Sequence, residues 1–178
     1  MSKNSNFVFK FLSVVAWVIF VGLCIEAGAL IVNFVYSLFK PEIIAYLYEK
    51  LDLSDMYSRS KWAYYGMYSF IMVISVLKAY LFYIVSILVT KLDMSKPFSS
   101  FVSKQISLIS YFTFSIGISS FIARQTAKNL LHRGYEIDQL DKFWVDSEAF
   151  ILMAAVVYVI ATIFKKGIEL QNEQDLTV

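Results

Sequence analysis

The sequence is poor in the residues from which covalent and metal sites are usually built. Its 178 residues include one cysteine, Cys24, and one histidine, His132. A single cysteine excludes an internal disulfide and leaves the redox compartment open. One cysteine and one histidine are too few for the usual zinc ligand sets. We therefore expect neither a metal site nor a bound cofactor.

Common catalytic motifs are missing as well. The chain has no GxxxxGK[ST] phosphate-binding loop and no GxSxG nucleophile elbow, and its six glycines are scattered. None of the serines has a neighbouring histidine that could activate it. These absences favour a protein that is not an enzyme.

Charge is scarce, and apolar residues dominate. Only 17% of the residues are charged, the formal net charge is +2, and the basic residues are spread over several segments. No long basic stripe is present, so direct nucleic-acid binding is not expected. By contrast, 58% of the residues are hydrophobic and the mean hydropathy is +0.62. This composition is typical of a membrane protein, and its first expected partner is the lipid bilayer.

Four apolar stretches are long enough to cross a bilayer, which takes about 20 residues in a helix. They cover approximately residues 11–39, 62–89, 105–123 and 147–164. Because lipid offers no hydrogen-bond partners to the backbone, such continuous apolar runs have to be helical. The sequence predicts an all-α, integral membrane four-helix bundle. It forms a single domain over residues 1–178, with a cytoplasmic tail at 165–178.

The distribution of Lys and Arg orients these helices. Seven lie in the N-terminal segment, the second connection and the tail, and eight lie in the first and third connections, so the count alone does not decide. The seven, however, lie close to helix ends with few acidic residues beside them, whereas the eight in the first and third connections are mixed with nine acidic residues. Basic residues near helix ends favour the cytoplasmic side of a membrane. We therefore expect both termini to be cytoplasmic.

The two outer connections are long enough for short amphipathic helices. Pro41 suits the first turn of one, which is expected to lie flat on the membrane surface. In the third connection, apolar residues alternate with charge, and Gly134 can end a short helix at residues 127–132. Together the two connections could form a small outer cap. Such a cap could sense a ligand, but two connectors that cover helix ends are the favoured interpretation.

Two charged residues interrupt the first two spans. Glu26 lies about halfway along the first span and Lys78 about halfway along the second. Ionisable groups at that depth are costly and normally face a partner or a wet cavity. Their similar depth predicts an intramembrane ion pair with a structural role. A proton or ligand site, or two side chains that reach water separately, are the alternatives.

Two short motifs lie in the second connection and at the C-terminus. The connection contains Lys96-Pro97-Phe98, and the chain ends in KKGIELQNEQDLTV. These stretches resemble the bacterial membrane-protein family known as domain of unknown function 2975, with its four spans and its RxGxELQxExDLTV-like ending. Lys166 stands where that pattern has a frequent Arg, which keeps the charge but loses the planar fork. The other matching positions are Gly167, Glu169, Leu170, Gln171, Glu173, Asp175, Leu176, Thr177 and Val178.

The resemblance implies a location and a partner. Members of this family are bacterial, which points to the cytoplasmic (inner) membrane, and they are frequently encoded beside small helix-turn-helix regulators. It thus implies a non-enzymatic membrane protein that docks or sequesters such a transcription factor, with the two motifs as the docking surface and Phe98 packed on the last helix. The simpler interpretation of the C-terminal segment is that it is polar only because it leaves the membrane and enters water. The alternative function is a small transporter or ion-conducting homo-oligomer that uses Glu26 and Lys78.

Overall fold

The computed structural model describes residues 3–93, 97–144 and 146–175, and this part of the chain is helical with no β-strand. The expected all-α fold is therefore confirmed. Four long α-helices are joined by one short α-helix and three 3₁₀ segments. In chain order these are α1 (Lys3–Phe39), η1 (Pro41–Tyr46), η2 (Tyr48–Lys50), α2 (Ser54–Arg59), α3 (Lys61–Lys91), α4 (Ser100–His132), η3 (Asp138–Phe143) and α5 (Ser147–Asp175).

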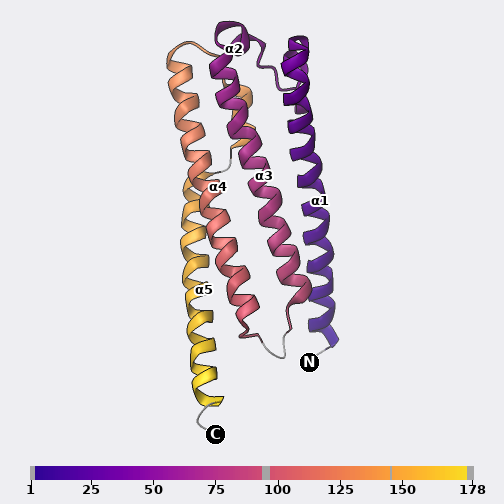
Figure 1. The fold of residues 1–178 in the computed structure, drawn as a ribbon, viewed down its shortest axis with the longest axis vertical. Helices are drawn as coiled ribbons and strands as arrows, with labels where there is room; N and C mark the ends of the chain where they lie inside the picture. Colours follow the sequence, from indigo (N-terminus) through magenta and orange to yellow (C-terminus); the bar gives the residue numbers. More distant parts are fainter. Residues whose placement is uncertain (1–2, 94–96, 145, 176–178) are drawn as a thin grey trace.

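The four long helices are the four predicted spans, and each is long and apolar enough to cross a membrane. α1 packs against α3, α3 against α4, and α4 against α5. In Figure 1 they stand side by side in that order, with both chain ends at the same end of the molecule. We call this the terminal end, and the opposite end, which holds η1, η2 and α2, the loop end.

The helices are longer than the apolar runs from which they were predicted. α3 has 31 residues and α4 has 33, which corresponds to lengths of about 46 and 50 Å against a hydrocarbon core of about 30 Å. The separate short helix predicted at 127–132 is wrong, because these residues are the last turns of α4. α4 continues to His132, and Gly134, whose φ is +80°, ends the helical path.

α5 is displaced along the bundle relative to α4. Its first residue, Ser147, lies against Gly117, which is 15 residues before the end of α4. α5 therefore begins about 22 Å below the loop end of α4. At its other end it remains helical through Asp175, across most of the segment predicted as a tail, and projects past the other helices (Figure 1).

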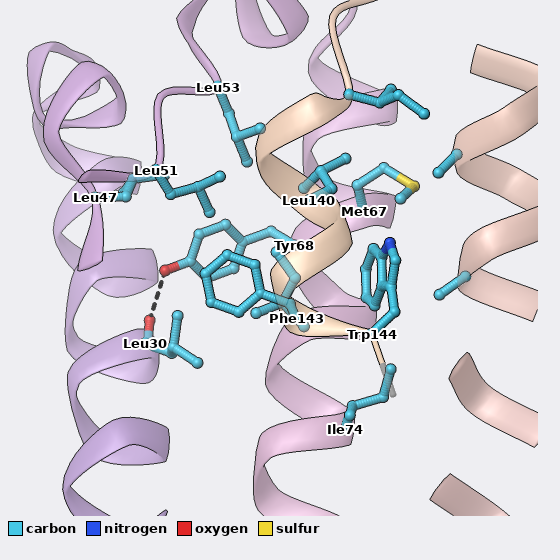
Figure 2. Packing of buried hydrophobic residues seen from close by; sticks show 14 of the residues in the cluster. Leu30, Leu47, Leu51, Leu53, Met67, Tyr68, Ile74, Leu140, Phe143 and Trp144 are labelled. Carbon is cyan, nitrogen blue, oxygen red and sulfur yellow. Dashed lines mark hydrogen bonds between the residues drawn. The ribbon is translucent and has the colours of Figure 1, made fainter. Parts of the chain in front are cut away.

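The segment before α5 fills the loop-end half of the bundle. Leu140, Phe143 and Trp144 are buried and belong to one apolar cluster with Leu30 of α1 and Ile74 of α3. Figure 2 shows this cluster, with Trp144 beside α3 and the aromatic rings between the helices. The third connection is therefore part of the core and not a surface connector.

The first connection is buried in the same way. Ile44, Leu47 and Leu51 are 0 to 2% exposed and join the same cluster. The apolar residues of this segment therefore pack on protein. An amphipathic segment can place its apolar face on lipid or on protein, and here neighbouring helix ends that project beyond the span provide a protein surface.

Polar contacts join the two connections into a loop-end cap, as the sequence suggested. Lys142 Nζ donates to the Glu49 carbonyl (2.7 Å) and lies 3.9 Å from its carboxylate. Arg59 donates to the carbonyls of Gly134 and Arg133 and lies over the Tyr135 ring, 4.1 Å from its centroid. The first and third connections thus form one unit above α3.

Candidate functional site

The terminal end brings the two sequence motifs together. The Phe98 ring lies against α5, with its centroid 5.2 Å from that of Phe164. A Cβ atom at Gly167 would be 2.9 Å from Phe98 Cδ1 and 3.0 Å from Cε1. Gly167 therefore leaves the space that the ring occupies, and the prediction that Phe98 packs on the last helix is confirmed.

The position of Phe98 is set by the start of α4. The Ser99 hydroxyl accepts a hydrogen bond from the Val102 amide (3.3 Å), which is the usual side-chain contact of an N-cap. Phe98 directly precedes this capped turn, so its ring is held where the second connection meets α5. Lys96 lies outside the described residues.

The motif residues that follow Gly167 lie on the projecting end of α5. Lys166 and Glu169 form an exposed ion pair at 4.0 Å, of the kind that contributes little to stability. Leu170 lies beyond the apolar part of the helix, and this large apolar side chain is nevertheless 60% exposed. Gln171 and Glu173 are exposed too. Asp175 ends α5, and Leu176, Thr177 and Val178 lie outside the described residues.

The two intramembrane charges lie at matching depth but do not meet. Phe20 packs on Tyr83 at 5.5 Å and Phe34 packs on Tyr68 at 5.2 Å between ring centroids. Glu26 lies between these two contacts along α1, and the corresponding stretch of α3 includes residue 78.

The predicted ion pair is nevertheless not formed. The ion pairs within 4.0 Å in the described part of the chain include Arg59–Asp55, Lys142–Glu49 and Lys166–Glu169, and none of them involves Glu26 or Lys78. Glu26 and Lys78 are both half-buried. Along α1 and α3, the Phe20–Tyr83 and Phe34–Tyr68 ring contacts lie on either side of the two charged residues.

Other polar contacts between α1 and α3 were not predicted. Tyr64 Oη donates to Ser37 Oγ (2.8 Å) and Tyr68 Oη donates to the Leu30 carbonyl (3.0 Å), both in the buried region. Near the terminal end, Thr90 Oγ1 accepts from Trp17 Nε1 at 3.2 Å. Tyrosines inside an apolar run look like ordinary core residues, although their hydroxyl groups need partners when buried.

α4 and α5 approach closely through small residues. Ser110 Oγ donates to the Ala154 carbonyl (2.9 Å), and a Cβ atom at Gly117 would be 2.9 Å from Ile151 Cγ1. Such contacts replace large apolar side chains where membrane helices pack tightly. In the described part of the chain, no group of three or more His, Cys, Asp or Glu residues is arranged to hold a metal ion.

Comparison with protein-family models identifies a relationship over most of the chain. A family model described as "Protein of unknown function (DUF2975)" matches residues 51–178, from the first connection to the C-terminus. The match includes the Phe98 contact and Lys78 but not α1 with Glu26. No curated protein and no solved structure matches the chain.

Proposed function

The chain belongs to the family of proteins of unknown function DUF2975, and from this membership and the contacts of its terminal end we propose that it is a non-enzymatic membrane regulator. In this proposal it is a multi-pass protein of the bacterial inner membrane with both termini in the cytoplasm. Its terminal end docks, and thereby sequesters, a small helix-turn-helix transcription factor.

The packing of Phe98 over Gly167 is the observation that carries this proposal. It unites the second connection with α5, so that the described motif residues of both segments lie at one end of the molecule. An even number of spans also puts the second connection and both termini on the same side of the membrane. A partner on that side can contact both segments at once.

The projecting part of α5 has the chemistry that a DNA-binding partner would recognise. Leu170 offers an exposed apolar group, and Glu169 and Glu173 lie on the same short stretch of helix. DNA-binding proteins carry basic surfaces that contact phosphates. A carboxylate-bearing helix with one apolar contact residue complements such a surface, and a regulator held there would be kept from DNA.

Co-purification with a small helix-turn-helix regulator tests the proposal. Leu170→Ser and Glu169→Lys should each lower the amount of regulator recovered from detergent-solubilised membranes, by roughly tenfold for a central contact residue. Leu131→Ser is the matched control, because Leu131 is also an exposed leucine (50%) but lies at the loop end. Higher salt should weaken the complex, because its charged contacts lie near water.

Removal of residues 169–178 gives the decisive outcome. This deletion leaves the apolar part of α5 and the other three spans intact, so membrane insertion should persist while the regulator is lost. If the shortened protein binds the regulator as well as the full chain does, α5 is not the docking surface.

A small transporter or ion-conducting oligomer is the second candidate function. It is favoured by one observation, that Glu26 and Lys78 are half-buried charges within two adjacent spans. Ion or proton flux into proteoliposomes tests it. Flux that disappears in Glu26→Gln and Lys78→Met would support transport, whereas wild-type vesicles as tight as empty ones would reject it.

A further inference from the structure

Glu26 and Lys78 lie on the same side of the row of helices. Leu30 and Ile74 both belong to the cluster that Phe143 and Trp144 cover (Figure 2). Glu26 precedes Leu30 by four residues and Lys78 follows Ile74 by four, and residues four apart share a helix face. Glu26 therefore lies one helical turn nearer the terminal end than Leu30, and Lys78 one turn nearer the terminal end than Ile74. Both lie on the side of the helices that Phe143 and Trp144 cover.

The two residues also lie at the same depth to within about one helical turn. The ring contacts Phe20–Tyr83 and Phe34–Tyr68 bracket the position of Glu26 and set which part of α3 is level with it. Glu26 lies six residues after Phe20 and eight residues before Phe34. The corresponding position between Tyr83 and Tyr68 on α3 falls near residue 77, next to Lys78.

Neither charge has an ion-pair partner within its own described chain, and the helix that carries Glu26 is largely uncovered. Only 6% of an 18-residue apolar stretch of α1 is buried, against 39% of the corresponding stretch of α3. α1 is packed by α3 along its length and by η1 and η2 at the loop end. A carboxylate and an ammonium group thus lie beside a helix surface on which a further protein surface can pack.

We propose that the chain forms a two-fold symmetric dimer through this face, in which Glu26 of each copy pairs with Lys78 of the other. A two-fold axis along the membrane normal leaves every residue at its own depth. An acid and a base at equal depth on one face are then brought together twice, in reciprocal pairs. The face is self-complementary in charge, and both costly groups gain a partner.

Charge reversal tests this arrangement. Glu26→Lys or Lys78→Glu alone should reduce self-association at least tenfold, measured by single-molecule photobleaching in nanodiscs, because each puts two like charges into both contacts. In a mixed dimer of these two variants both contacts unite opposite charges again. Co-expression of the two variants with different tags should therefore restore association to the wild-type level.

The mixed experiment separates pairing between chains from pairing within one chain. If the two residues paired within one chain, only a chain that carries both Glu26→Lys and Lys78→Glu would recover self-association. The mixture of the two single variants would then associate as weakly as each variant alone. That result, or a wild-type protein that is monomeric in nanodiscs, overturns the proposal. Arg133→Glu at the loop end is the control for charge reversal, and it should leave association unchanged.

Wild-type protein provides a second test that does not depend on the folding of variants. A membrane-permeant carbodiimide joins a carboxylate to an amine in direct contact, with loss of water. We expect a covalent dimer whose digest contains the Glu26 peptide linked to the Lys78 peptide. The same linked peptides in the monomer-sized band, or no covalent dimer, overturn the contact between copies.

Discussion

Phe98 Cδ1 lies 2.9 Å from the point where a Cβ atom at Gly167 would be, so the ring packs this closely on the last helix because residue 167 has no side chain. Gly22, on α1, is the opposite case, because nothing lies within 4 Å of its Cβ position. These two helical glycines make a matched pair for substitution.

Gly167→Ala should destabilise the protein, by about 1–2 kcal/mol for a new methyl group pressed against a packed ring. Gly22→Ala should be neutral or slightly stabilising, because alanine favours helix over glycine by about 0.5–1 kcal/mol. Thermal unfolding in detergent measures both. Equal effects of the two substitutions would mean that the ring does not restrict residue 167.

Phe98→Ala provides the check on cause. It removes the ring that the new methyl group would meet, so Gly167→Ala should cost less in this background than in the wild type. If the two substitutions are additive, the loss of stability does not come from the contact between these two residues.

Tyr68→Phe should lower stability by about 1 kcal/mol, because it removes the buried hydrogen bond to the Leu30 carbonyl and leaves that carbonyl without its Tyr68 donor. The measurement is again thermal unfolding in detergent. Tyr111→Phe is the control, since Tyr111 is 59% exposed. An unchanged midpoint in Tyr68→Phe would show that this hydroxyl contributes no net stability.

Arg59→Lys should loosen the loop-end cap while keeping the charge. Lysine lacks the planar fork that donates to two carbonyls and covers the Tyr135 ring. Hydrogen exchange should become faster at residues 133–137, by about fivefold if roughly 1 kcal/mol of local stability is lost. Arg133→Lys is the control, because its contact with Arg59 is made by the backbone carbonyl.

The topology predicts which cysteine substitutions can be labelled from outside the cell. In a Cys24→Ser background, Ser58→Cys at the loop end should react with a membrane-impermeant maleimide on intact cells. Ser100→Cys at the terminal end should react only after lysis. Both serines are exposed in the structure. The reverse labelling pattern would place the terminal end outside and remove the basis of the cytoplasmic docking proposal.

The spans could be predicted because lipid imposes a strict requirement on them. A continuous apolar run in a bilayer has to be helical, so residues 62–89 predicted α3 to within two residues at each end. Helix ends beyond the bilayer obey no such requirement. The predicted third span stops at Ala123, where the apolar run ends, although Ala127, Leu130 and Leu131 continue the helix to His132.

The packing of the connections and the direction of the charges could not be predicted. The amphipathic pattern around Leu140 shows that one side is buried, but not whether lipid or protein covers it. Position along a span gives the depth of Glu26 and Lys78, but their rotation about the helix axis depends on where the aromatic residues pack. The Phe98 contact was predictable because the motif lies in a short connection, whose side chains can reach only the helix ends next to it.

The path of the chain through the bundle has a consequence for biosynthesis. α1, α3, α4 and α5 are neighbours in space in the order in which the ribosome makes them, so each helix can pack on its predecessor as it enters the membrane. η3 departs from this sequence, because Leu140 and Phe143 contact a cluster that includes Leu30, more than 100 residues earlier. Until residue 144 has been synthesised, the nascent chain exposes this cluster, so the loop-end half stays incomplete while α1, α3 and α4 have already been made.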